Sequence, residues 1–529
     1  MIRALCLSLA LSTAVGCASP TDSSRPAPAA APAVTTDIVE LSATDARDRM
    51  AAGTLTSRAL TEAYLERIAQ LDDAGPRLDS VIELNPSALQ DAAALDAERQ
   101  AGKLRGPLHG LPVLLKDNID VAGMVNSAGS VALAEHRPAR DAFVAAQLRA
   151  AGAVILGKTN LSEWANFRST RSTSGWSSRG GQTKNAYVLD RNPCGSSSGT
   201  GTAIAASLAA IGVGTETDGS IICPAAVNGL VGLKPTVGLV GRTGIIPISI
   251  SQDTAGPMAR TVADTALMLN GLVGVDPADP ASAAAAGKTA SDYTTFLDAN
   301  ALQGKRIGVL RQVMGFHPAV DAATEAAIAA MKGKGAELVD IKIAGHNSWN
   351  DAEFSVLLYE FKDGLNTYLK SSGAPHASLE ALIAYNKANA DRTMPFFGQE
   401  IFEQAQAKGP LTDAAYIKAR DAARRLAGPE GIVAALDSNK LDALIAPSMS
   451  PAWPTDHVLG DHFLGAGYGM AAVAGTPSIT VPMGETHGLP LGLTFMTRAY
   501  GEGNLIALAY AFEQATKARK APEFKPTVE

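Results

Sequence analysis

Helical and strand patterns alternate along the chain after residue 38, and this alternation constrains the fold more than any other feature. Apolar residues recur at helical spacing in some segments, and short apolar runs follow others. The elements predicted before residue 220 are helices over 57–71, 141–151 and 202–210, and strands over 112–115, 153–156 and 211–215. Helices that lead repeatedly into apolar strands predict an α/β fold with a mostly buried sheet.

The second half begins with a long helical region and ends with further strands. Between residues 347 and 426, large apolar side chains recur near helical spacing. Such a stripe is usually core, and a helical layer that shapes substrate access is the alternative. The tail predicts strands over 442–447 and 477–482 and a helix over 504–518.

The first residues differ from the rest of the chain. A positive start and a short apolar stretch are typical of an export signal over residues 1–17. Lipidation of Cys17 and ordinary cleavage after Ala18 are both open, so we expect a periplasmic protein, with a membrane-anchored lipoprotein as one form. Residues 18–37 are rich in Pro, Ala and Ser and predict a tether, which leaves 38–529 as the folded domain.

Composition narrows the partners and the bound groups. The chain has 529 residues and a net charge of −7, which does not favour nucleic acid or an anionic membrane surface. Of its 4 cysteines, Cys194 and Cys223 lie in the body. Buried free thiols are favoured over a disulfide, and no spacing suggests a metal. The oligomeric state is left open.

Two motif matches lead to functions that their surroundings do not support. Residues 152–159 fit the phosphate-loop pattern, but Ala-Val-Ile-Leu between the glycines predicts a buried strand. Residues 195–199 fit the nucleophile elbow G-x-S-x-G, centred on Ser197. An elbow follows an apolar strand, whereas a polar segment ending in Pro193 precedes this one, and no downstream histidine lies in a convincing position.

Three other residues form a candidate catalytic set. Lys116 follows an apolar strand, where burial would lower its pKa and make it a competent base. Ser196 lies in a glycine-rich turn. Ser220 ends a strand-to-turn segment, with Pro224 expected as the first residue of a helix. Amide N–H groups before Ser220 could hold an oxyanion. A glycine turn with a capping serine is the simpler alternative for that segment alone.

Several ordered stretches resemble the amidase signature family of Ser-Ser-Lys hydrolases. They span nearly the whole chain after the tether. The stretches are 106–118, 157–163, 195–199, 214–225, 229–236, 256–261, 442–447 and 488–493. The resemblance implies the amidase signature fold, which is a single large domain with a mixed central β-sheet covered by helices.

The resemblance also implies roles for individual residues. Lys116 matches the family lysine, Ser196 the bridging serine beside a cis peptide bond, and Ser220 the nucleophile. The backbone N–H groups of Thr217, Asp218, Gly219 and Ser220 match the oxyanion hole. Ser197 is then a supporting residue, and no role is assigned to Ser198. No metal or organic cofactor is implied.

Two departures from the common family pattern refine the expected substrate. Asp218 stands where a glycine is common, and Ile222 stands where an arginine is common. Both are similar to bacterial peptide amidases, which implies a small peptide-amide substrate. A broad aryl or aliphatic amidase is the main alternative. An amidotransferase component is a remote alternative, because its partners are cytoplasmic whereas this chain begins with an expected export signal. A non-catalytic protein of this fold is disfavoured because Lys116, Ser196 and Ser220 are all present.

Overall fold

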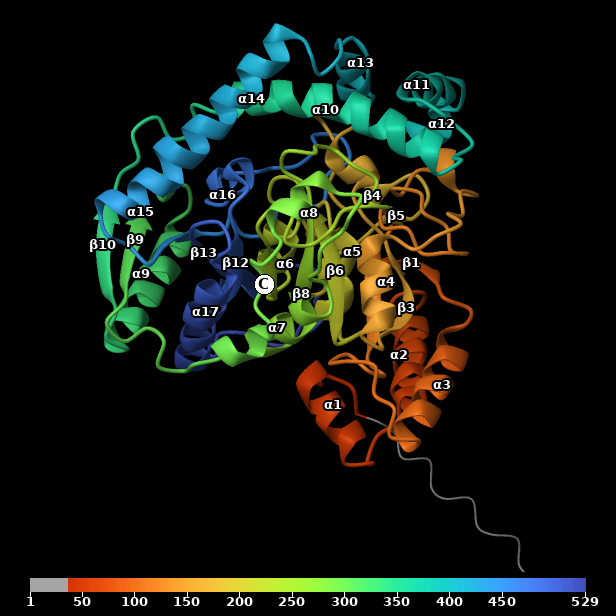
Figure 1. The fold of residues 1–529 in the computed structure, drawn as a ribbon, viewed down its shortest axis with the longest axis horizontal. Helices are drawn as coiled ribbons and strands as arrows, with labels where there is room; N and C mark the ends of the chain where they lie inside the picture. The colour runs from red at the N-terminus through yellow and green to blue at the C-terminus, as the bar shows by residue number, and fades with distance from the viewer. Residues whose placement is uncertain (1–36) are drawn as a thin grey trace, which may run out of the picture. The chain divides into compact units, whose positions relative to one another are not determined.

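Eleven strands form one mixed β-sheet through the middle of the molecule (Figure 1). The computed structural model describes residues 37–529. The strand order is β1-β3-β2-β6-β8-β7-β12-β13-β11-β9-β10. The strands are β1 (Val81–Leu84), β2 (Pro112–Lys116), β3 (Val154–Thr159), β6 (Ile211–Glu216), β7 (Val231–Lys234), β8 (Thr254–Ala259), β9 (Arg306–Leu310), β10 (Glu337–Ile341), β11 (Ala443–Pro447), β12 (Ser478–Thr486) and β13 (Leu489–Met496). The expected export signal and nearly all of the expected tether lie outside the described residues.

Parallel and antiparallel pairs alternate in blocks across this sheet. Strand β2 pairs in parallel with both β3 and β6, whereas β6 pairs antiparallel with β8. The residues of β2, β3 and β6 are buried throughout. Continuous apolar runs therefore marked the central strands, as expected for strands covered on both faces.

Helices cover the sheet, and two of them arch across one side of it. They are α1 (Ala43–Ala51), α2 (Ser57–Leu71), α3 (Ala88–Gln100), α4 (Phe143–Ala150), α5 (Ser198–Ala205), α6 (Ile222–Val227), α7 (Val262–Asn270), α8 (Pro280–Ala284), α9 (Pro318–Gly333), α10 (Asn350–Ser371), α11 (Leu379–Ala388), α12 (Ala390–Thr393), α13 (Glu400–Gln406), α14 (Ala414–Ala427), α15 (Ala434–Ser438), α16 (Gly469–Ala474) and α17 (Glu502–Thr516). Figure 1 shows α10 and α14 forming the arch. None of the helices over 37–529 is long and apolar enough to cross a bilayer.

The predicted α/β fold and its mixed sheet are confirmed, with shifts at several helix starts, two of which bear on the candidate site. Helix α5 begins at Ser198, four residues before the predicted start, so the serine cluster itself forms its N-terminus. Helix α6 begins at Ile222, which makes Pro224 its third residue rather than its first. A proline is tolerated there because the first-turn amides of a helix have no intrahelical acceptor.

A short two-stranded sheet lies apart from the central one. It pairs β4 (Trp176–Ser177) with β5 (Gly181–Gln182) in the glycine-rich region before the serine cluster. The region therefore contains tight turns and little regular structure. Those turns place the segment over 192–198 against the ends of β2 and β6.

Candidate active site

Lys116 ends β2 and contacts Ser196 at the N-terminus of α5. Its Nζ atom lies 2.8 Å from Ser196 Oγ. The same nitrogen lies 2.9 Å from Thr215 Oγ1 and 3.2 Å from the Thr215 carbonyl oxygen. Strands β2 and β6 are parallel neighbours, so their carboxyl ends meet and bring Lys116 to Thr215. The sequence-predicted pair of Lys116 and Ser196 is therefore in direct contact.

Burial controls the protonation of this lysine. The Lys116 side chain is fully buried. Burial lowers the pKa of Lys116 to about 7, and the negative charges of Glu216 and Asp253 oppose that change only in part. A lysine with this pKa exists to a large extent as a neutral amine near neutral pH, which is the form that can accept a proton.

The three serines of the cluster face different partners. The Gly195–Ser196 peptide bond is cis, as the resemblance implies. Ser197 Oγ donates to the Thr215 carbonyl at 3.1 Å and accepts from the Thr215 amide at 3.2 Å, while its own amide donates to the Ser220 carbonyl. Ser198 Oγ donates to the Cys194 carbonyl at 2.6 Å. Ser197 and Ser198 therefore hold the turn, and Ser196 is the member that contacts the lysine.

A tight turn between β6 and α6 carries Ser220. The Glu216 carboxylate accepts from the amides of Ile221 at 2.7 Å and Ile222 at 2.9 Å. Gly219 has φ +81°, a backbone conformation that a side chain would disfavour. In the described part of the chain, the amides of Thr217, Asp218 and Ser220 have no hydrogen-bond acceptor.

Glu216 therefore holds the turn through hydrogen bonds to its backbone amides. Burial raises the pKa of Glu216, and Lys234 and the amides of Ile222, Ile221 and Gly219 oppose that rise. Because the Gly219 amide already interacts with this carboxyl group, the free donors of the turn are those of Thr217, Asp218 and Ser220. Their arrangement could hold an oxyanion.

Cys194 and Cys223 form a disulfide, which corrects the preference for free thiols. Cys194 precedes Ser196 by two residues, and Cys223 follows Ser220 by three. The bond therefore ties the Ser196 turn to the Ser220 turn. The two cysteines are 29 residues apart in sequence, and their pairing arises from the fold, so spacing alone did not reveal it.

The two serines open onto different cavities that adjoin each other. Ser220 lines a cavity of about 320 Å³, called here the Ser220 cavity. Ser196 lines a cavity of about 460 Å³, called here the isoleucine cavity. Both cavities are lined by Ala165, Thr217 and Ile248. No hydrogen bond joins Ser220 Oγ to Ser196 among residues 37–529, so the bridge expected between them is not formed in this structure.

Two carboxyl groups line the Ser220 cavity beside its aromatic side chains. Asp218 and Asp461 line it together with apolar and aromatic residues, which include Phe167, Leu357, Trp453, Phe463 and Tyr468. The Asp218 side chain is exposed to the cavity. Desolvation within the cavity raises the pKa of Asp218 well above its usual range, and the nearby carboxyl groups of Glu353 and Glu216 add to the rise. Burial raises the pKa of Glu353 to about 7.

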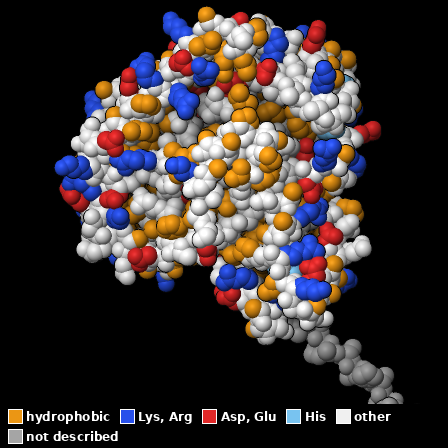
Figure 2. Space-filling view, viewed as in Figure 1, with side chains coloured by type: hydrophobic (Ala, Val, Ile, Leu, Met, Phe, Trp, Pro, Cys, Tyr) orange, Lys and Arg blue, Asp and Glu red, His pale blue; other side chains and the backbone are white. Residues whose placement is uncertain are grey.

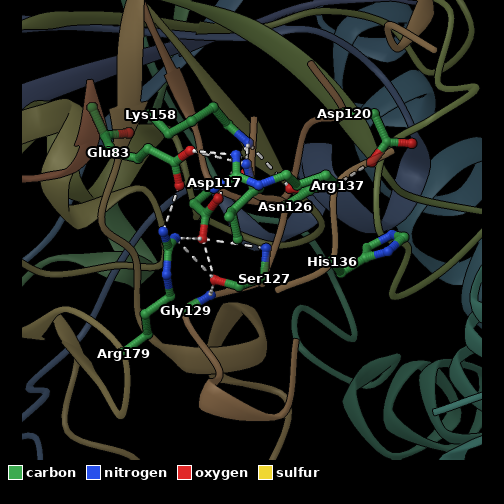
Figure 3. A network of polar contacts seen from close by, with 12 residues as sticks. Glu83, Asp117, Asp120, Asn126, Ser127, Gly129, His136, Arg137, Lys158 and Arg179 are labelled. Carbon is green, nitrogen blue, oxygen red and sulfur yellow. Dashed lines mark hydrogen bonds and ion pairs between the residues drawn. The ribbon is translucent and has the colours of Figure 1, made fainter. Parts of the chain in front are cut away.

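A buried polar network supports the loop that follows Lys116 (Figure 3). Asp117 forms an ion pair with Lys158 at 3.2 Å and another with Arg179 at 3.2 Å. Ser127 also donates to Asp117. Lys158 is the lysine of the phosphate-loop match, and it lies in β3 with its charge directed to Asp117. The predicted strand is thus confirmed there, and this lysine holds the protein's own loop.

Comparison with known proteins identifies the family. The family model described as Amidase matches residues 59–506. The chain belongs to the amidase family. As an amidase it is a hydrolase that acts on C–N amide bonds.

Three similar proteins illustrate the relationship in sequence and structure. The crystal structure of native peptide amidase from Stenotrophomonas maltophilia is 55% identical, with a TM-score of 0.89, over 92% of this chain and 99% of that chain. A probable amidase from Arabidopsis thaliana is 42% identical over 89% of both chains. A putative amidase from Schizosaccharomyces pombe is 36% identical over 89% of this chain and 84% of that one.

Sequence reasoning missed two residues that organise the amidase site. Apart from the Ser196 hydroxyl, the two oxygen atoms that contact Lys116 Nζ both belong to Thr215. Glu216 caps the turn that carries Ser220. Both lie at the end of β6 inside the Gly-Thr-Glu-Thr-Asp-Gly-Ser stretch. An acid at the end of an otherwise apolar strand was the available signal, because a buried carboxylate requires donors close by.

Proposed function

We propose that this amidase hydrolyses the C-terminal amide of peptides to a carboxylate and ammonia through an acyl-enzyme on Ser220. The contact set of Lys116 carries the proposal. A neutral amine has two N–H donors and one lone pair, and the two oxygen atoms of Thr215 can accept both N–H groups. The lone pair is then left for the hydroxyl proton of Ser196 at 2.8 Å.

The reaction begins with proton transfer along this set. Lys116 accepts the proton of Ser196, which takes the proton of Ser220 as Ser220 Oγ attacks the amide carbon. Because Ser196 and Ser220 are not yet hydrogen-bonded, a small side-chain rotation on substrate binding completes the relay. Catalytic contacts often tighten only in the substrate complex.

The developing negative charge lies on the former amide oxygen. The free amides of the turn over 217–220 are the donors nearest to Ser220 along the chain, and they support the assignment of an oxyanion hole. The relay then reverses, the C–N bond breaks, and the proton from Ser196 leaves with ammonia. Water resolves the ester by the same route.

The peptide class of the substrate rests on two observations. The overall similarity to the peptide amidase of Stenotrophomonas maltophilia is high and covers nearly all of that chain. The Ser220 cavity combines aromatic side chains with carboxyl groups, which suits a peptide that presents both apolar and polar groups. Asp461 is held by Ser174, Asn192 and Trp453. Asp218 is therefore the carboxyl group that remains for a substrate, and a broad aryl or aliphatic amidase would have less use for it.

A pair of variants tests the nucleophile. Ser220→Ala should lose ammonia release from a peptide amide and should no longer be labelled by a fluorophosphonate. Ser197→Ala is the matched control, because Ser197 lies in the neighbouring turn and has only supporting contacts. Labelling that persists at Ser197 in the Ser220→Ala protein would overturn the assignment.

Substrate comparison tests the peptide class. Ammonia release is measured from peptide amides, free amino-acid amides and simple aliphatic or aryl amides at equal concentration. The proposal expects the highest kcat/KM for peptide amides. Equal or faster turnover of the simple amides would favour the broad-specificity amidase.

We also propose that the protein is exported, on the basis of its first residues alone. Intact-mass measurement of the protein from the producing cell tests this. A mass that starts at Cys17 with attached lipid supports an anchored lipoprotein, whereas a start at Ser19 supports a periplasmic protein. A mass that includes Met1 would refute export.

A further inference from the structure

The isoleucine cavity has no assigned role in the reaction so far. It lies between the α8 region and α10, with Ser196 and Thr215 at its inner end. Figure 2 shows hydrophobic side chains gathered in the middle of this face, below the helical arch. Its apolar lining consists of Ala165, Ile245, Ile246, Pro247, Ile248, Ile250, Ala278, Pro280 and Ala281.

Most charged residues of this cavity already have partners, whereas Asp363 of α10 is exposed and has no ion pair or side-chain hydrogen bond among residues 37–529. Arg242 forms an ion pair with Asp279 at 2.6 Å and donates to the Ile250 carbonyl at 2.7 Å. Asp253 accepts from Thr217 Oγ1 at 2.6 Å and from the amide of Ile248 at 2.8 Å. The hydroxyl of Tyr368 donates to Asp120 at 2.6 Å. The cavity therefore offers an incoming group mainly apolar contact.

The direction of proton transfer decides which part of a substrate would face this cavity. In the proposed mechanism, the acyl carbon becomes bonded to Ser220 Oγ, while the leaving nitrogen receives its proton from Ser196 Oγ. That nitrogen must therefore lie within about 3 Å of Ser196. The acyl portion then extends into the Ser220 cavity, and any substituent on the nitrogen extends into the isoleucine cavity.

The isoleucine cavity is much larger than the ammonia that a primary amide releases. A water molecule occupies about 30 Å³ in the liquid, and ammonia is of similar size. A cavity of about 460 Å³ is an order of magnitude larger. It is large enough for an aryl or alkyl group of a drug-like fragment.

We propose that the isoleucine cavity is a subsite for an apolar amine, so that this amidase also cleaves amides whose nitrogen carries an aryl or alkyl substituent. The inference rests on the proposed roles of Ser196 and Ser220. The bond between Ser220 Oγ and the acyl carbon forms, the C–N bond breaks, and the Ser196 proton leaves on the primary amine. Water then releases the carboxylic acid and returns Ser220 to its hydroxyl form.

A peptide as leaving group is disfavoured by the same lining. Its backbone would bring several N–H and C=O groups into the cavity, where each would need a hydrogen-bond partner. Apart from Asp363, the charged groups there already have partners, so they would have to exchange an existing partner for a new one. The cavity thus favours an apolar amine over an extended chain.

The test uses three substrates with one acyl group: a peptide primary amide, its N-methylamide and its N-benzylamide. Benzylamine is less basic than methylamine and is the better leaving group, so the kcat/KM ratio of the two amides is also followed in a variant with a narrowed cavity, where this intrinsic difference cancels. We expect kcat/KM for the benzylamide to exceed that for the methylamide at least tenfold. Amine release is followed by chromatography, and acid formation by mass spectrometry.

A variant at the mouth of the cavity links the effect to this site. Thr367 lines the cavity from α10 and is exposed, so Thr367→Trp can narrow the cavity without disturbing the core. The benzylamide to methylamide ratio should fall at least fivefold. Ile417→Trp, at an exposed position of α14 that lines neither cavity, is the control and should leave the ratio unchanged.

The outcomes separate the two proposals. Hydrolysis of the primary amide with no cleavage of either substituted amide would overturn the subsite and leave the proposed function standing. An unchanged ratio in Thr367→Trp would also overturn it. If none of the three substrates is hydrolysed, the proposed function is refuted, and the subsite with it.

Discussion

Replacing Lys116 provides the sharpest test of the catalytic reasoning. Burial lowers the pKa of Lys116 from the usual 10.5 to about 7. Each tenfold change in an acid constant corresponds to about 1.4 kcal/mol, so the lowering amounts to roughly 5 kcal/mol in favour of the neutral amine. At pH 7 an ordinary lysine is neutral about once in 3,000 molecules, whereas Lys116 is neutral in about half of them.

The wild-type pH profile should show this directly. kcat/KM for a peptide amide is measured by ammonia release between pH 5 and 10. Below a pH of about 7, we expect it to rise tenfold per pH unit, because only the neutral lysine accepts the Ser196 proton. Above that pH it should level off.

Two substitutions separate protonation from folding. Lys116→Arg keeps a charge that cannot be removed in proteins, so activity should fall by at least a thousandfold and should not recover at pH 9. Lys116→Met removes the base and keeps an apolar stem of similar length. It should be equally inactive and should remain folded.

The same variant makes a stability prediction with a defined sign. A lysine with a lowered folded-state pKa binds fewer protons than the unfolded chain between about pH 7 and 10.5, so it makes wild-type stability rise with pH in that window. At pH 7 and below, the wild type bears nearly the full cost, because it must either bury the charge or release a proton that the unfolded chain keeps. Lys116→Met should therefore be more stable than wild type at pH 7, and the difference should shrink as pH rises toward 10.

Three results would refute the reasoning. A wild-type acid limb near pH 10 would mean that Lys116 is not desolvated. A flat profile from pH 5 to 9 would mean that no group with a pKa of about 7 controls the reaction. Substantial activity in Lys116→Arg would mean that a neutral base at this position is unnecessary.

The remaining predictions concern the supports of the site. Reducing the disulfide should lower the stability by about 2–4 kcal/mol, seen as a lower Tm in a thermal melt, and should slow amide hydrolysis because it frees the two serine turns; an unchanged Tm would contradict this. Gly219→Ala should inactivate the enzyme, since its Cβ would overlap the Tyr468 ring at a φ of +81°; wild-type kcat/KM would argue against a tightly packed turn. Lys158→Met should lower the free energy of unfolding in urea by about 3–5 kcal/mol, because the buried Asp117 carboxylate loses one of its two ion-pair partners. Adding Asp117→Asn to that variant should recover part of the loss.

Regular elements were predictable because their signals are local. Apolar runs located β2, β3, β6 and β11, and helical spacing located α2 with both ends correct. The ends of α5 and α6 were less accurate, because side chains at a helix start respond to partners outside the helix. The Ser198 hydroxyl donates to Cys194, which is not a signal within the helix itself.

The candidate residues came from motif resemblance, whereas their contacts came only from the fold. Lys116 and Ser196 are far apart in sequence. Strand pairing brings Lys116 to Thr215, and the hydrogen bonds of Ser197 to Thr215 hold Ser196 beside them. The role of Thr215 depends on the register of β6 against β2, which no local pattern specifies. The cavities likewise depend on how α8 and α10 approach the sheet.

Three buried lysines show why position along a strand does not identify the base. Lys116, Lys158 and Lys234 each lie at or near the end of an apolar strand, and each is fully buried. Lys158 has a carboxylate at 3.2 Å, in Asp117. Lys234 donates to the Pro235 carbonyl, and the charges of Glu216, Glu502 and Asp218 partly offset the burial that lowers its pKa to about 8.

Lys116 differs from Lys158 in the charge of its hydrogen-bond partners, and from Lys234 in its contact with a serine hydroxyl. Its hydrogen-bond partners are two oxygen atoms of Thr215 and the hydroxyl of Ser196, all of them uncharged. Desolvation is therefore opposed only by more distant charges, and its pKa falls to about 7. A buried amine with neutral partners loses its proton readily, whereas one with a carboxylate in contact keeps it. Adding a carboxylate beside Lys116, as in Thr215→Asp, should restore the charged amine and move the acid limb of activity upward; a limb that stayed at pH 7 would show that the partners do not set the protonation.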